Sequence, residues 1–118
     1  MPHPSQFSID GIFWINKGDE LFMGPNQYRL FSQVIKDGSI LAASQNLKVS
    51  YQHAWKTIDR MNSLSPLPLV SRHKGGYAGG GCQVSNFGMQ VLKLIEDKDV
   101  QFEKFLSEIN KDFDLCSF

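Results

Sequence analysis

The chain has 118 residues and a formal net charge of zero, and 42% of its residues are hydrophobic. This composition excludes a disordered chain and favours one folded domain with a modest core. No apolar run is long enough to cross a bilayer, and the N-terminus lacks the basic and apolar stretches of a signal peptide, so we expect a cytoplasmic protein with no membrane partner. The two cysteines, Cys82 and Cys116, are expected to stay reduced.

Charge is distributed unevenly along the chain. Residues 45–80 hold five basic residues and one acidic residue, a balance of +4, whereas residues 96–114 hold three basic and seven acidic residues, a balance of −4. A basic centre favours contact with an anionic partner such as nucleic acid. Two ordinary solvated surfaces would produce the same counts, so the distribution alone does not decide.

Short strands are expected first. Residues 7–15 carry β-forming side chains on a broken alternation, which predicts a strand bent at Gly11. A turn over residues 16–19 follows, and residues 20–23 are expected to pair back on the first strand.

Three helices are expected next, and small or capping residues mark their ends. Pro25 lies at the start of the first helix, and Gly38 suits the left-handed position that ends it. Ser39 and Ser50 can cap the second and third helices with their side-chain hydroxyls. The buried stripes expected on the three helices are Leu30, Phe31, Val34 and Ile35, then Ile40, Ala43 and Leu47, then Ala54, Ile58 and Met61.

A glycine-rich hairpin and a long helix complete the chain. Apolar segments flank the glycines, which predicts a two-stranded wing over about residues 67–85. Ser85 can cap a last helix over about residues 86–113, in which Gly88 is expected to allow close backbone packing. The apolar stripe of this helix runs too far for a lone surface helix on so small a domain, so we expect a homodimer. The residues expected at the dimer interface are Val91, Leu94, Ile95, Phe102, Phe105 and Ile109.

This order of elements predicts one winged helix-turn-helix domain over residues 1–118, mainly α-helical with a small β-hairpin wing and a long C-terminal dimerisation helix. In such a fold, one helix enters the major groove of DNA and the wing presses on the flanking backbone.

The third helix carries side chains that suit base edges and phosphates. Gln pairs with adenine, and Lys or Arg pairs with guanine, through two hydrogen bonds. The residues near the helix start that are expected to reach bases are Ser50, Tyr51, Gln52 and His53. Lys56 and Arg60, one and two turns later, are expected to reach phosphates. An ordinary polar surface face is the alternative that this helix alone leaves open.

Two aromatic residues, Tyr51 and Trp55, lie between the apolar stripe and the polar face of the third helix. We expect Trp55 to complete the rim of the core. Tyr51 either completes the same rim or reaches a phosphate with its hydroxyl, and the pattern does not choose between them.

The wing loop holds five glycines in residues 74–81. It lacks the lysine that ends a nucleotide-binding loop and does not match the dinucleotide fingerprint, so a flexible wing is favoured. Arg72, His73 and Lys74 stand at its entry and are expected to meet the DNA backbone or the minor groove. A plain solvent loop is the alternative.

No catalytic or metal-binding pattern is evident. His3, His53 and His73 share no ligand spacing, and neither cysteine stands beside a histidine. We therefore expect no enzyme activity, no metal and no cofactor.

The residues from Ser50 to Asn62 read SY..AW..ID.MN, and a run of glycines follows a basic strand. In these features the chain resembles the N-terminal DNA-binding domain of the ModE-type molybdate-responsive transcriptional regulators, which is itself similar to the LysR-type winged helix. The resemblance covers nearly the whole chain and implies a homodimer, joined through its first and last helices, that binds palindromic double-stranded DNA. The DNA contacts that it implies are Ser50, Tyr51, Gln52, His53, Lys56, Arg72 and Lys74, with the adjoining Gly75 and Gly76.

Two departures from the family limit what the resemblance implies. Full-length members bind molybdate in further C-terminal domains, and this chain ends at Phe118 without them, so we do not expect it to sense the oxyanion by itself. A separate effector or partner protein is left open. The family's GGKGGGG loop reads GGYAGGG here, so Tyr77 replaces a cation and a weaker or different backbone contact is expected.

Two other functions stay open at this stage. The same scaffold could serve as a protein-interaction or dimerisation module whose long helix docks a partner, in keeping with the acidic tail and the zero net charge. Single-stranded RNA is less favoured, because no aromatic platform on a sheet is expected.

Overall fold

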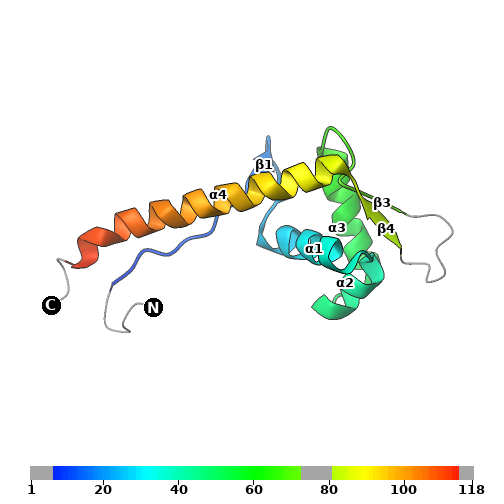
Figure 1. The fold of residues 1–118 in the computed structure, drawn as a ribbon, viewed down its shortest axis with the longest axis horizontal. Coiled ribbons are helices and arrows are strands. Elements are labelled where there is room, and N and C mark those ends of the chain that lie inside the picture. Colours follow the sequence, from blue (N-terminus) through cyan, green and yellow to red (C-terminus); the bar gives the residue numbers. More distant parts are fainter. Residues whose placement is uncertain (1–6, 73–80, 115–118) are drawn as a thin grey trace.

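The computed structural model describes residues 7–72 and 81–114, and the molecule is elongated (Figure 1). Its extents are 63 × 29 × 23 Å and its radius of gyration is 17.9 Å. A compact domain of 100 residues has a radius of gyration of about 13 Å. The extra length comes from helix α4 (Asn86–Asn110), which leaves the other helices and projects outward. We call residues 98–110 of α4, together with residues 7–14 beside them, the arm.

The compact end of the molecule contains the three predicted helices. They are α1 (Pro25–Asp37), α2 (Ile40–Leu47) and α3 (Tyr51–Leu64), and each pair of them is in contact. The predicted order and spacing of these elements are confirmed.

Local signals in the sequence set the helix ends as predicted. Gly38 adopts the left-handed conformation, with φ of 68°, and ends α1. The Ser39 hydroxyl accepts a hydrogen bond from the Ala42 backbone N–H at 3.1 Å, and the Ser50 hydroxyl accepts one from the His53 N–H at 3.0 Å. These bonds satisfy backbone donors that have no partner inside a helix.

One hydrophobic core joins the three helices, the base of the wing and the inner half of α4. The predicted stripes lie in it, except that Ile35 and Leu47 are only half-buried. Ala43 and Ala54 are fully buried, and their small side chains let α2 and α3 approach closely. The buried hydrophobic residues are Met23, Leu30, Phe31, Val34, Ile40, Ala43, Ala54, Trp55, Ile58, Met61, Leu69, Val70 and Ile95.

Two antiparallel hairpins flank the helices. Strands β1 (Ile15–Lys17) and β2 (Glu20–Met23) form the first, so the predicted pairing of residues 20–23 is confirmed, with the turn confined to residues 18–19. Strands β3 (Val70–Arg72) and β4 (Cys82–Val84) form the wing, with Val70 opposite Val84.

The predicted strand over residues 7–15 is wrong for all but its last residue. Residues 7–14 have no strand partner and run along the outer part of α4 (Figure 1). The Asn110 side chain bonds the Ile9 backbone N–H at 2.6 Å and its carbonyl at 2.9 Å, and the Phe13 and Phe102 ring centroids lie 5.4 Å apart. Helix side chains thus occupy the place that a neighbouring strand would take.

Helix α4 starts against the wing, and a short 3₁₀ turn extends it at its C-terminal end. The Ser85 hydroxyl caps it by accepting from the Gly88 N–H at 2.9 Å, as predicted. After Asn110 a 3₁₀ turn follows (η1, Lys111–Asp114). No helix in residues 7–72 or 81–114 is long and apolar enough to cross a membrane.

Gly88 is buried where α4 meets the wing. A Cβ atom at this position would lie 2.5 Å from the Leu69 carbonyl oxygen and 3.1 Å from Val84 Cγ1. No side chain fits at that distance from a backbone atom, so the expected close packing is confirmed.

We predict that Gly88→Ala destabilises the chain by about 1–3 kcal/mol, because the added methyl group overpacks the contact with Leu69. The substitution does so although Ala is favoured over Gly in a helix by about 1 kcal/mol. Urea unfolding measures the change, and Gln90→Ala, at an exposed position of the same helix, is the control, with a change within about 0.5 kcal/mol. A Gly88→Ala variant as stable as the parent would contradict the packing argument.

Candidate nucleic-acid interface

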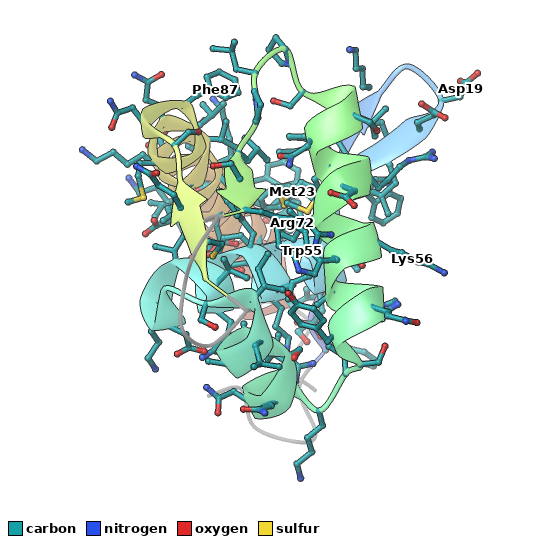
Figure 2. The ribbon with its side chains drawn as sticks, turned by 90° about the vertical axis from the view of Figure 1, so that its right-hand side faces the viewer. Asp19, Met23, Trp55, Lys56, Arg72 and Phe87 are labelled. Atoms are coloured by element: carbon teal, nitrogen blue, oxygen red, sulfur yellow. The ribbon has the colours of Figure 1, made fainter. Side chains whose placement is uncertain are left out.

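Helix α3 presents one polar face to solvent. Gln52, His53 and Lys56 are exposed, whereas Trp55 and Ile58 on the other face are buried. Figure 2 shows Lys56 pointing away from the body of the molecule. Gln52, His53 and Lys56 are therefore accessible to a partner along the first two turns of α3.

A tight turn sets the direction of α3 relative to α2. Lys48 adopts a left-handed conformation, with φ of 58°, and the Val49 N–H bonds the Ser44 carbonyl at 3.0 Å. The side chain of Ser50 then caps α3. The turn between the two helices thus consists of Lys48, Val49 and Ser50, and α3 begins directly after it.

The two aromatic residues of α3 pack against each other. Trp55 is 5% exposed and belongs to the core, as predicted. Tyr51 is half-buried, and its ring meets the Trp55 ring edge-on at 6.5 Å between centroids. This contact favours the interpretation in which Tyr51 completes the rim of the core, and any contact of its hydroxyl with DNA stays a prediction.

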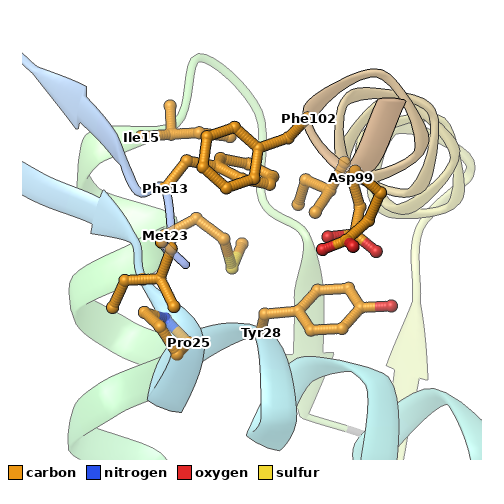
Figure 3. A pocket seen from close by; sticks show the side chains of 12 residues that line it. Phe13, Ile15, Met23, Pro25, Tyr28, Asp99 and Phe102 are labelled. Atoms are coloured by element: carbon orange, nitrogen blue, oxygen red, sulfur yellow. The ribbon is translucent and has the colours of Figure 1, made fainter. Parts of the chain in front are cut away.

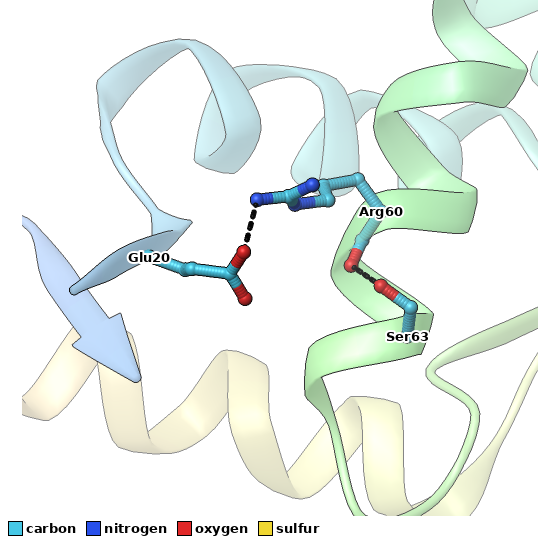
Figure 4. Close-up of polar contacts among 3 residues, drawn as sticks. All are labelled: Glu20, Arg60 and Ser63. Carbon is cyan, nitrogen blue, oxygen red and sulfur yellow. Dashed lines mark hydrogen bonds and ion pairs between the residues drawn. The ribbon is translucent and has the colours of Figure 1, made fainter. Parts of the chain in front are cut away.

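Arg60 lies further along α3 and forms an ion pair with the first hairpin. Its Nη2 atom is 2.9 Å from Oε1 of Glu20 on β2 (Figure 4). Both side chains are more than half exposed, so the pair is worth at most about 1 kcal/mol. A phosphate would have to compete with Glu20 for Arg60, and the predicted phosphate contact is still a prediction.

The described part of the wing is fixed to the helices at several points. The Arg72 guanidinium lies over the Trp55 ring at 3.8 Å from its centroid, and Ser39 forms an isolated bridge with Gly81.

Burial raises the pKa of the half-buried Cys82 thiol, which lowers its reactivity, while a hydrogen bond with the Ile40 backbone opposes that rise.

Several predicted residues lie outside the described ranges. They are His73, Lys74, Gly75, Gly76 and Tyr77 of the wing loop, with His3 and Cys116 near the chain ends. Within residues 7–72 and 81–114, no group of three His, Cys, Asp or Glu side chains could hold a metal ion.

Asn62 is the functional-site residue that sequence reasoning missed. Its Oδ1 accepts hydrogen bonds from the backbone N–H groups of Leu69 and Val70, at 2.8 and 3.4 Å, and its Nδ2 donates to the Val70 carbonyl at 2.8 Å. The side chain therefore acts as a short strand partner that ties the end of α3 to β3. The available signals were its place as the last residue of the SY..AW..ID.MN motif and a poor helix former in the last turn before a proline-rich segment.

The predicted dimer residues of α4 fall into three classes of exposure. Leu94 and Phe105 are 53% and 57% exposed, and Val91, Phe102 and Ile109 are half-buried. Ile95 is 4% exposed and belongs to the core of the chain itself.

A cavity of about 250 Å³ opens between α1, α4 and residues 11–15 (Figure 3). Phe13, Met23 and Phe102 are among its apolar walls, and Asp99 and Tyr28 lie at one side. Burial raises the pKa of Tyr28, and the nearby charges of Glu96 and Asp99 raise it further. The cavity lies beside the half-buried Phe102, so it continues the apolar surface of the arm.

Known proteins with a similar sequence include bacterial transcriptional regulators, and the similarity covers helices α1 to α3. Residues 25–79 match the family described as "Bacterial regulatory helix-turn-helix protein, lysR family". The chain is 40% identical over 76 residues to "Transcriptional regulator ModE" of Haemophilus influenzae, a match that covers 64% of this chain and 30% of that protein. It is 32% identical over 89 residues to "Molybdenum transport protein ModE" of Azotobacter vinelandii, covering 75% of this chain and 33% of that protein. The chain thus spans about a third of the length of these relatives.

Solved structures share the fold at low sequence identity. The full-length regulator LysG of Corynebacterium glutamicum aligns with a TM-score of 0.54 and 16% identity, over 73% of this chain and 28% of that one. OxyR of the same organism aligns with a TM-score of 0.53 and 18% identity, over 71% of this chain and 25% of that one. The predicted winged helix-turn-helix fold with a long C-terminal helix is confirmed.

We predict that Asn62→Ala lowers the free energy of unfolding by about 1–3 kcal/mol, because the backbone groups of Leu69 and Val70 lose their partner in a half-buried place. Urea denaturation followed by circular dichroism measures the loss. Asn46→Ala is the matched control, since the Asn46 amide makes an exposed hydrogen bond to Asp37, and a change within about 0.5 kcal/mol is expected. Equal effects of the two substitutions would contradict the role given to Asn62.

Proposed function

Residues 25–79 match the lysR family of bacterial regulatory helix-turn-helix proteins, and from this premise we propose that the chain binds double-stranded DNA sequence-specifically as a homodimeric transcriptional regulator. The observation that carries the proposal is the capped helix α3, on which Gln52, His53 and Lys56 are exposed. Gln52 offers an amide for an adenine edge, and Lys56 offers charge for a phosphate one turn later.

The apolar surface of the arm supports the homodimer. Phe7 and Ile12 from residues 7–14 are 62% and 66% exposed, and Val100 and Phe105 on α4 expose more than half of their surface. Leu94, one turn before the arm on α4, is 53% exposed as well. Soluble monomers rarely leave so many large apolar side chains together in water. A second copy that covers this surface would place two α3 helices in one particle, which suits a palindromic site.

Selection of bound duplexes from a random pool tests the proposal. We expect an enriched consensus with two-fold symmetry, because an isologous dimer reads the same half-site twice. The enriched duplex then serves in gel-shift titrations at several salt concentrations. A dimer that neutralises ~6–10 phosphates loses affinity by ~10³–10⁵ between 50 and 200 mM salt. No enrichment and no salt-sensitive binding to any duplex would exclude the proposed function.

We predict that Lys56→Ala weakens binding to all duplexes by a similar factor, because it removes a charge that neutralises a phosphate whatever the base sequence. The slope of log K against log salt should fall by ~0.9 for each phosphate that the variant no longer neutralises, or by ~2 for a dimer. Lys104→Ala is the control, since Lys104 is an exposed lysine on the arm, and its slope should equal that of the parent. An unchanged slope for Lys56→Ala would remove this residue from the phosphate contacts.

We predict that Phe105→Asp converts the dimer to a monomer at micromolar concentration, because a carboxylate would be buried in an apolar interface. Sedimentation velocity measures the change. Ser107→Asp adds the same charge two residues further on, at an exposed polar position, and should remain dimeric. A parent chain that sediments as a monomer would refute the dimer, whether or not it binds DNA.

A further inference from the structure

Arg72 is the last residue of β3, and its side chain crosses from the wing to α3. The centre of its guanidinium group lies 3.8 Å from the centroid of the Trp55 ring (Figure 2). At this distance the flat guanidinium covers the face of the indole. Within residues 7–72 and 81–114, the Arg72 side chain forms this stack and no ion pair.

The Trp55 ring is held by packing on its faces and edges. Trp55 is almost fully buried, yet its Nε1 atom has no hydrogen-bond partner in the described part of the chain. Most buried indole N–H groups have such a partner, which fixes the tilt of the ring. Here the Tyr51 ring on one side and the Arg72 guanidinium on another take that role.

Strand β3 is therefore attached to α3 at both of its ends. At the start, the Asn62 amide bonds the backbone of Val70, and at the end Arg72 stacks on Trp55. Asn62 and Trp55 lie two helical turns apart on α3. Two attachments at this separation restrain the angle between the strand and the helix more strongly than either one alone.

We propose that Arg72 is a positioning residue that sets the wing against the recognition helix α3 through its stack on Trp55, and that it acts on DNA binding through this placement and not by neutralising a phosphate. The part that concerns DNA rests on the proposed function. The part that concerns the wing rests on the contact alone. Arg72 is the last residue of β3, so the stack restrains this end of the strand against α3.

Charge and shape can be separated by substitution at position 72. Lys keeps the positive charge but lacks the planar group that stacks on an aromatic face. Ala lacks both the charge and the plane. A phosphate contact requires the charge, whereas a positioning stack requires the plane, so Arg72→Lys should bind DNA like the parent if Arg72 contacts a phosphate and like Arg72→Ala if it positions the wing.

The first measurement uses the 118-residue chain without DNA. Nitrogen-15 NMR shows one indole N–H resonance for each of Trp14 and Trp55, and Trp55→Phe assigns them. We expect Arg72→Ala and Arg72→Lys to shift the Trp55 resonance and speed its exchange with solvent, because neither keeps a planar group over the ring. The Trp14 resonance is the internal control, because this residue lies on the exposed segment beside α4. A Trp55 resonance that is the same in all variants would overturn the placement of the wing by Arg72.

The second measurement uses a duplex enriched from the random pool. We expect Arg72→Ala and Arg72→Lys to weaken binding by about three- to tenfold, with the salt slope of the parent. Lys56→Ala is the comparison, since it is expected to lower the slope. Full affinity for Arg72→Lys together with a slope lowered by ~2 for Arg72→Ala would assign Arg72 to a phosphate and overturn the proposal.

The two measurements also separate this inference from the proposed function. A parent chain that binds no duplex would refute the proposed function and the DNA part of the inference with it. The NMR measurement would still decide the placement of the wing, because it needs no DNA.

Discussion

The close packing around Leu69 is the constraint on which the rest of the structure depends. Leu69 is fully buried, and its backbone N–H bonds Asn62 at the end of α3, while its carbonyl accepts from the Ser85 N–H at 2.9 Å. The same carbonyl oxygen lies so close to Gly88 that a Cβ atom there would clash. The recognition helix, both strands of the wing and the start of α4 thus meet at one backbone position. None of them can turn without breaking a bond or a contact at this point.

This constraint explains how a small chain holds two reading elements in a defined relation. The capped start of α3 is directed by the turn after α2, and its far end is attached to β3 through Asn62. The bridge between Ser39 and Gly81 connects the wing to the start of α2 as well. A shift of the wing relative to α3 would therefore strain the bonds of Asn62, the bridge to Ser39 and the stack of Arg72 on Trp55. The apolar core holds the elements together, and the polar contacts fix the position of the wing relative to α3.

Sequence reasoning succeeded where the signal was local and failed where it depended on a partner in space. Ser39, Ser50 and Ser85 cap helices because a hydroxyl reaches only the next turn, and Gly38 ends a helix because of its own conformational freedom. The β-forming residues 7–14 could pair with a strand or pack on a helix, and nothing in their alternation names the partner. Likewise, Arg72 carried a charge that suggested phosphate, and its position over Trp55 depends on the angle between β3 and α3, which no spacing in the sequence encodes.

The zero net charge of the chain is compatible with DNA binding because the charges are separated in space. The exposed cations Lys56 and Arg60 lie at the compact end, whereas the acidic residues of α4 lie toward the arm, in a molecule 63 Å long (Figure 1). At physiological ionic strength the field of an exposed charge decays over about 8 Å. A duplex against α3 would therefore experience the local cations and little of the acidic arm. The net charge counts residues that lie too far apart to act on the same partner. The charges near α3 therefore matter more for DNA binding than the net charge of the chain.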